Sequence, residues 1–381
     1  MATLFESTAT EWIVREKAPS GAQIHQLTSA PAINDHEYFE VPYMDASSRY
    51  VMFTRMHDSI GPVGLWRADL ERRLVTKVAE TTGRMRGHAV SPDQRFFYYT
   101  DLRDGRSYEL VELDITTLER RAWAFDDDRF LPRTRGSVTP DRRYYINSAY
   151  LGNKRFGVWR LDMESGERQL IWEQGEDMCN AHPQLEPGRG QDLLIQHNRG
   201  AIVDDTGRHI LLVGEIGATL YLVDINGKNH RTLPVGQPFT QRCQGHQCWL
   251  GTTGEILLTV GGGPREEVLR AGNLLAVRPG DERARVVAKG VYFDHCNASR
   301  DGRYFVSDTS PNASLVIGSI KTGRWHLLCE TGSSLSSPQY THPHPYLSPD
   351  NQWVIYNSDR TGIPHVYAAR VPEGLLAGLE A

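Results

Sequence analysis

In Ser91-Pro92-Asp93-Gln94-Arg95-Phe96-Phe97-Tyr98-Tyr99, a turn sequence runs directly into aromatic residues. Proline fixes φ, and the aspartate side chain bonds back to the backbone, so the first half predicts a tight turn. The aromatic half fits a half-buried strand. The same phrase recurs along the chain, with close copies beginning at Thr139, Ser299 and Ser348 and weaker copies at Ala46 and Thr252. The chain is therefore built from repeats of one turn-and-strand unit.

A second strand follows the phrase and ends in aspartate. Examples are Leu65–Asp69, Leu110–Asp114, Val158–Asp162 and Leu220–Asp224. Each unit is then a small antiparallel sheet that repeats every ~40–50 residues, which is typical of a propeller blade. The repeats predict an all-β, seven-bladed β-propeller with blades near 37–80, 87–126, 136–175, 181–236, 244–290, 294–332 and 341–372. The regular repeat disfavours the alternative of a large β-sandwich.

The seven units fill the chain, so we expect one domain over residues 37–381. Residues 1–36 are expected to form a lead-in helix and the strand that closes the ring, because closure removes open sheet edges.

Composition narrows the possible functions. Hydrophobic residues make up 39% and charged residues 23% of the 381 residues, as in ordinary globular proteins. A net charge of −5 disfavours a nucleic-acid partner. No apolar run approaches the ~18 residues of a membrane helix, so no membrane partner is expected. The N-terminal residues do not form a secretory signal, and the five cysteines have no CxxC spacing. These features predict a cytoplasmic protein with reduced thiols.

Histidines repeatedly precede the inner strand of a predicted blade. They are His88, His182, His246, His295, and His342 with His344. In a propeller these positions converge on the central channel, so residues far apart in sequence meet there. A single histidine at such a position is also typical of a structural hydrogen bond to a turn, and both interpretations stay open for His88 and His182.

The strongest cluster is Gln339-Tyr340-Thr341-His342-Pro343-His344-Pro345. In an extended segment His342 and His344 point to the same side, and the prolines hold the backbone extended. Two imidazoles with His295 of the neighbouring blade suit a transition metal, and Gln339 adds an amide oxygen. We therefore predict a divalent-metal site at His295, Gln339, His342 and His344, with Mn²⁺ as the expected ion.

These segments resemble the oligogalacturonate lyase family, metal-dependent polysaccharide lyases of pectin degradation with a seven-bladed propeller. The resemblance covers most of the chain, and its most specific pieces are Gln339…His342-Pro343-His344-Pro345, Asp294-His295-Cys296-Asn297 and Gly245-His246-Gln247-Cys248-Trp249. It implies a manganese ion held by His295, Gln339, His342 and His344, an oligogalacturonate substrate, and His246 as the catalytic base. The implied reaction is β-elimination, in which the base removes the C5 proton beside the uronate carboxylate and a divalent cation neutralises that carboxylate.

The chain departs from the family at an arginine. The family pattern places a catalytic arginine where this chain has Thr219. Arg199 and Arg242 are the candidates to replace it, because a guanidinium can bind a carboxylate with two hydrogen bonds. Substrate contacts are expected from Arg84, Arg86, Arg135, His182, His197 and Tyr292. Trp249 is an alternative stacking surface, and each aromatic could equally belong to the core.

Two other functions remain open from the sequence. A uronate isomerase or epimerase would share proton abstraction beside a carboxylate and use the same residues. A non-catalytic, TolB-like propeller module would share the Ser-Pro-Asp repeat, since fold does not fix function. The latter does not need His295, Gln339, His342 and His344 together.

Overall fold

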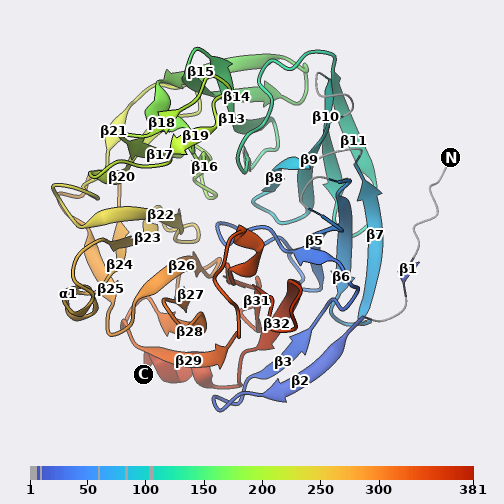
Figure 1. The fold of residues 1–381 in the computed structure, drawn as a ribbon, viewed down its shortest axis with the longest axis vertical. Helices are drawn as coiled ribbons and strands as arrows, with labels where there is room; N and C mark the ends of the chain where they lie inside the picture. The colour runs from blue at the N-terminus through green and yellow to red at the C-terminus, as the bar shows by residue number, and fades with distance from the viewer. Residues whose placement is uncertain (1–6, 9–10, 59–60, 82–84, 103–106) are drawn as a thin grey trace.

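The computed structural model describes residues 7–8, 11–58, 61–81, 85–102 and 107–381. Their antiparallel sheets are arranged as seven blades around a central channel, as the repeats predicted (Figure 1). Blade one contains β4 (Ile33–Asp35), β5 (Tyr50–Met56), β6 (Gly64–Asp69) and β7 (Leu74–Glu80), with β1 (Ser7–Thr8) at its outer edge. Blade two contains β8 (Arg86–Val90), β9 (Phe96–Leu102), β10 (Tyr108–Asp114) and β11 (Arg120–Phe125). Blade three contains β12 (Ser137–Val138), β13 (Tyr144–Gly152), β14 (Arg155–Asp162) and β15 (Arg168–Gln174).

The remaining blades follow the same order from the channel outward. Blade four contains β16 (Gln184–Leu185), β17 (Asp192–Arg199), β20 (Gly217–Asp224) and β21 (Arg231–Thr232), with a hairpin of β18 (Ile202–Val203) and β19 (His209–Leu211) inserted. Blade five contains β22 (Arg242–Trp249), β23 (Ile256–Gly261), β24 (Leu274–Val277) and β25 (Arg285–Ala288), with helix α1 (Arg265–Ala271). Blade six contains β26 (Phe293–Ala298), β27 (Tyr304–Thr309), β28 (Ser314–Ser319) and β29 (Trp325–Glu330).

Blade seven joins the two ends of the chain. It contains β30 (Tyr346–Leu347), β31 (Trp353–Ser358) and β32 (His365–Arg370), followed outward by β3 (Gln23–Gln26) and β2 (Ile13–Lys17). Strand β3 pairs antiparallel with β32, so an N-terminal strand closes the ring (Figure 1). The expected lead-in helix is wrong for the described residues before β4, which form strands instead. The first blade also begins at Ile33, inside the segment assigned to the lead-in.

Short helices complete the fold: η1 (Glu176–Met178), η2 (Gln339–Thr341) and the C-terminal α2 (Leu375–Glu380). None of the helices in the described residues is long and apolar enough to span a bilayer. All five cysteines are unpaired.

The geometry of the repeated phrase explains why it recurs. Ser91 Oγ accepts a hydrogen bond from the Phe96 N–H at 2.9 Å and donates to Asp93 Oδ1 at 2.5 Å. The fourth position, Gln94, has φ 58°, which completes the turn. Arg95, which follows the turn, pairs at 2.8 Å with Asp114, the last residue of β10. Corresponding pairs, Arg49–Asp69 and Arg143–Asp162, link turn and strand end in blades one and three.

The start of each inner strand lies at one end of the channel. Hydrophobic contacts between neighbouring blades hold these strands in place; for example, Tyr98 of blade two packs against Tyr145 of blade three. Because the blades are rigidly packed in this way, side chains at the strand starts of different blades can be held at fixed separations.

Candidate metal centre and active site

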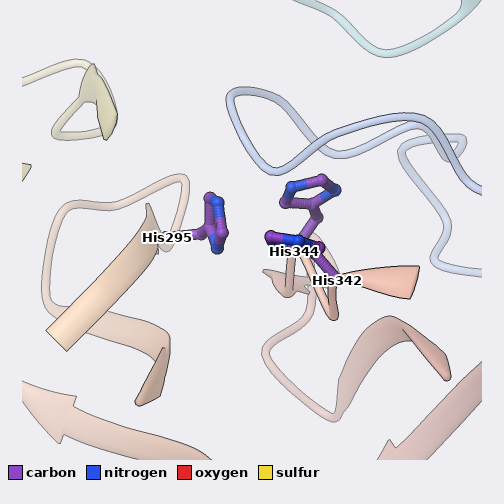
Figure 2. Close-up of side chains that lie close together, drawn as sticks. All are labelled: His295, His342 and His344. Carbon is purple, nitrogen blue, oxygen red and sulfur yellow. The ribbon is translucent and has the colours of Figure 1, made fainter. Parts of the chain in front are cut away.

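Three histidines from blades six and seven meet at one end of the channel. His295 lies on β26, and His342 and His344 lie between η2 and β30. One ligand atom from each ring lies within 4.8 Å of the others. The ring centroids of His295 and His344 are 4.3 Å apart, and those of His342 and His344 are 5.6 Å apart. Figure 2 shows His295 reaching in from one side and the other two from the opposite side.

A carboxylate fixes the orientation of His295. Its Nδ1 lies 2.9 Å from Asp308 Oδ2, and both side chains are almost fully buried. Asp308 also accepts from the His295 backbone N–H at 2.7 Å. With Nδ1 donating to the carboxylate, Nε2 is left as the electron-pair donor, which is the arrangement that supports metal-ligating histidines. Burial alone would lower the pKa of His295, but Asp308 and Asp294 raise it above the ordinary value.

His344 is fully buried, yet neither of its ring nitrogens has a hydrogen-bond partner in the described part of the chain. Burial, followed by the neighbouring His295, holds the pKa of His344 well below its ordinary range, so the ring is neutral at neutral pH. Neutral imidazole is the metal-ligating form. A buried, neutral and unpartnered ring facing two others fits a metal ligand, because an unsatisfied buried polar group is otherwise costly.

His342 completes the cluster from a half-buried position. Its Nε2 donates to the Ser336 carbonyl at 3.0 Å, and its Nδ1 has no partner among the described residues. Burial and the adjacent His295 lower the pKa of His342. The residues present therefore fit a transition-metal ion: three imidazoles, each with a nitrogen available for coordination.

The backbone differs from the expected extended segment at one residue. His342 is extended, with φ −91° and ψ 145°, but His344 has φ 44°. The prediction of a fully extended His-Pro-His was therefore wrong at His344. The residue before a proline ordinarily adopts β or polyproline geometry. Strained residues of this kind concentrate at functional sites, where surrounding contacts hold them.

Gln339 lies on η2, one turn before His342. Its carbonyl accepts from the His342 N–H at 2.9 Å, and its side chain is exposed. The same short helix thus brings Gln339 and His342 together, so the amide remains a predicted fourth ligand.

His246 lies beside the cluster on the neighbouring inner strand β22. Its ring centroid is 4.1 Å from that of His295, and its Nδ1 is 2.9 Å from Asp294 Oδ1. Burial and then His295 lower the pKa of His246, and Asp294 opposes this shift. Burial would raise the pKa of Asp294, but His295 and His246 hold it far below the usual range. An ionised Asp294 beside Nδ1 leaves Nε2 of His246 able to accept a proton.

Comparisons with known proteins bear on the family and the fold of this chain. No family model matches the chain. It is 22% identical over 404 residues to an oligogalacturonide lyase of Pectobacterium atrosepticum, covering 94% of this chain and 96% of that one. It is also 22% identical to an oligogalacturonate lyase of Dickeya dadantii, covering 93% and 95%. This chain is a distant relative of the oligogalacturonate lyase family.

A solved structure supports the relationship at the level of fold. An oligogalacturonate lyase in complex with manganese superimposes with a TM-score of 0.74 at 19% identity, covering 97% of this chain and 98% of that one. The fold is thus shared with that structure along nearly the whole chain.

Arg242 is the arginine placed nearest to the departure from the oligogalacturonate lyase pattern. Thr219 is buried on β20, where it pairs with His197. Arg242 begins β22, the strand that carries His246. A Cβ on Gly262 would lie 2.6 Å from Arg242 Nε, and a Cβ on Gly217 would lie 2.6 Å from Arg242 Cβ. Two glycines at positive φ therefore make room for this side chain.

Burial is the main cause of the raised pKa of Tyr292. Asp294 and Arg242 also lie close enough to affect this pKa. Its hydroxyl lies over Gly261, where a Cβ would be 2.1 Å away. Tyr292 thus lies near both Arg242 and Asp294, and Arg242 shares strand β22 with His246. Arg199, at the end of β17, is exposed, and no contact connects its side chain to this group.

The other expected substrate residues are dispersed. Arg84 lies outside the described residues. Arg86 is half-buried at the start of β8. Arg135 lies inside the channel, with its guanidinium 4.0 Å from the Tyr38 ring centroid. It also borders a cavity of about 130 Å³ at the far ends of the inner strands, and Trp249 lines the same cavity. Trp249 is thus placed away from the histidines, whereas Arg135 packs on Tyr38 and its charge adds to the effect of burial in lowering the pKa of His344.

His182 and His197 have protein partners. His182 Nδ1 contacts Glu40, and both side chains are buried. His197 Nε2 lies 3.0 Å from Asp177 Oδ2 and also contacts Gln174. Sequence reasoning gave no role to five residues that the structure places in contact with the candidate histidines: Asp308, Asp294, Tyr38, Phe39 and Glu40. Asp294 stood in a quoted motif, but the others carry no motif; the only signal was the apolar, acidic stretch after His36.

Proposed function

We propose that this protein is a metal-dependent lyase that cleaves short oligogalacturonates, or related uronate oligosaccharides, by β-elimination. The observation that carries the proposal is the convergence of His295, His342 and His344 beside the His246–Asp294 pair, in a chain related to oligogalacturonate lyases over nearly its full length. Mn²⁺ is the proposed ion because the related structure contains manganese and the three imidazoles with one amide suit a first-row metal.

Different side chains have different roles in the proposed reaction. When bound, a divalent cation at the three histidines supplies Lewis-acid neutralisation of the substrate carboxylate. His246 Nε2 takes the C5 proton while Asp294 holds the opposite ring nitrogen and stabilises the resulting imidazolium. The electron pair left at C5 forms the C4–C5 double bond as the C4–O4 bond breaks, and O4 leaves with its electron pair. Burial of His246 favours its neutral, proton-accepting form.

Arg242 is proposed to replace the guanidinium that the family has at the Thr219 position. It reaches the site from the strand of His246, and the Gly217 and Gly262 backbones leave space for it. A guanidinium beside Tyr292 can bind a substrate carboxylate through two hydrogen bonds and stabilise charge that develops during proton removal.

The substrate prediction has a direct assay. With Mn²⁺ and di- or trigalacturonate, we expect a rise in ultraviolet absorbance from the unsaturated product, and loss of this rise after chelator treatment. Only a lyase generates that double bond, so an isomerase or epimerase would convert the substrate without the rise. Mass spectrometry of the products should show fragments without added water. Absence of both signals on these substrates and on other uronate oligosaccharides would contradict the lyase proposal.

For Arg242→Ala we expect kcat/KM to fall by about 10²-fold, a typical effect of removing one donor that stabilises developing charge. Arg242→Lys should recover part of the loss, because lysine keeps the charge but not the paired hydrogen bonds. Mn²⁺ content should not change in either variant. Arg199→Ala is the matched control and should stay close to wild type. A reversed result, with Arg199→Ala impaired and Arg242→Ala active, would transfer the role to Arg199.

A further inference from the structure

The segment His36–Met44, which we call the channel segment, connects β4 to β5 through the centre of the propeller. His36, Phe39, Tyr43 and Met44 are completely buried, and Tyr38 and Glu40 are nearly so. This segment is part of the connection 36–49 between the two strands, and such a connection ordinarily lies at the surface, because loops need water for their backbone groups. This segment instead obtains its partners from other blades.

Its aromatic side chains pack directly against the histidine cluster. The Tyr38 ring centroid is 4.6 Å from that of His344. The Phe39 ring centroid is 5.3 Å from that of His295 and 5.9 Å from that of His246. Two residues of one segment therefore form the apolar floor beneath the proposed metal ligands and the proposed base.

Hydrogen bonds tie the same segment to both ligand-bearing stretches. Asn297, two residues after His295, donates from Nδ2 to the Phe39 carbonyl at 2.7 Å. The Asn297 Oδ1 accepts from the Leu347 N–H at 3.1 Å, which links it to the strand that follows His344. His36 Nε2 lies 3.1 Å from the carbonyl of Pro343, the residue between His342 and His344. The channel segment is thus bonded on both sides of the cluster.

Two buried acid–histidine contacts hold the segment from the other blades. Glu40 contacts His182, which precedes β16 of blade four. Glu37 Oε2 lies 2.8 Å from His88 Nδ1 on β8 of blade two. His182 also has φ 43° and precedes a proline, the same unusual geometry as His344. Such strain persists only where surrounding contacts over-determine the backbone, so both histidines are held in place from more than one side.

We infer that Glu40 and His182 are positioning residues for the histidine cluster, and that they act through the channel segment. Their contact fixes Tyr38 and Phe39, and these rings and the Phe39 carbonyl fix the spacing of His295 and His344. Coordination needs ligand atoms placed to within about 0.5 Å, so a loosened floor lowers affinity without removing any ligand. This inference rests on the proposed metal site, but not on the identity of the sugar.

The test measures Mn²⁺ affinity by calorimetry with the full-length protein and Mn²⁺ alone. For His182→Ala and Glu40→Ala we expect roughly tenfold weaker binding, as for other residues that orient metal ligands. If the two residues act through their mutual contact, the double variant should lose no more than either single variant. His182→Asn keeps an amide N–H near the Nδ1 position and should bind Mn²⁺ nearly as well as wild type.

His25→Ala is the matched control. His25 is also a buried histidine with a side-chain partner, Trp12, but it lies on β3 and does not contact the channel segment. Its removal should lower the melting temperature and leave Mn²⁺ affinity unchanged, which separates positioning from general stability. Unchanged Mn²⁺ affinity in folded His182→Ala and Glu40→Ala would overturn the inference.

If those two variants do not fold, Phe39→Leu decides the question, because it keeps apolar volume but removes the ring beneath His295. Weaker Mn²⁺ binding supports the inference, and wild-type affinity contradicts it. A wild-type protein that binds no divalent metal would refute the proposed metal site itself. That result is distinct from equal binding by wild type and variants, which would refute only the positioning role.

Discussion

His344→Ala should lose the bound divalent cation and all measurable turnover while the propeller remains folded. The ring sits between His295 and His342, and neither of its nitrogens bonds another described residue. Removing it therefore breaks no protein hydrogen bond, and the expected cost is that of a small buried cavity, about 1–3 kcal/mol. Removing a ligand should cost more than the 10–100-fold lost when a residue that only orients a ligand is changed.

Elemental analysis measures the metal bound per chain, and circular dichroism shows whether the propeller remains folded. His342→Ala should behave in the same way. His326→Ala is the matched control, because His326 lies exposed on β29 of the blade that carries His295. Stoichiometric metal in both His344→Ala and His342→Ala would show that the ion binds elsewhere.

The fold could be predicted because the repeated phrase is recognisable from a few neighbouring residues. Ser91, Asp93 and the left-handed Gln94 form one turn within four residues, so every copy of the phrase carries its own evidence. The ring closure needed one further argument, that an open edge must be covered. The N-terminal helix was wrong because β3 pairs with β32, a partner more than 340 residues away that local sequence does not reveal, and β2 then pairs with β3.

The histidine cluster was predictable for a related reason. His342 and His344 are separated by one residue, and His295 occupies a corresponding place in the preceding blade, so position within the repeat predicts position in space. The acidic residues that contact the histidines do not recur at a fixed position in the repeat. Glu40 meets His182 across 142 residues, and Asp308 reaches back from the second strand of blade six to His295 on the first. The ring arrangement brings Glu40 and His182 together, and the pairing of β26 with β27 brings Asp308 to His295.

The propeller also explains why the proposed ligands and the proposed base lie in one place. Each inner strand begins at the same end of the channel, so neighbouring blades five and six place His246 and His295 side by side. Their partners differ. Asp308 binds His295 from within the same blade, whereas Asp294 of blade six binds His246 of blade five. The carboxylate that precedes His295 is thus directed to the base and not to the ligand beside it.

We expect His246→Ala to keep its metal and a similar substrate affinity while kcat falls by ~10²–10⁴, the usual contribution of a general base. That loss corresponds to about 2.7–5.5 kcal/mol of transition-state stabilisation. His246 is not part of the three-histidine set, and its Nδ1 faces Asp294, so its removal should leave those three ligands in place. Because His246 also forms a second possible metal group with Asp294 and His295, loss of metal in the variant would place the ion there. If His246 only stabilised the strand start, the variant would melt earlier but remain active at low temperature. Metal content, melting temperature and kcat measured on the same preparation separate these cases.

A folded, metal-loaded His246→Ala enzyme with wild-type turnover would rule out His246 as the base. His197 would then be tested, because it also contacts a carboxylate, that of Asp177, and is also partly exposed.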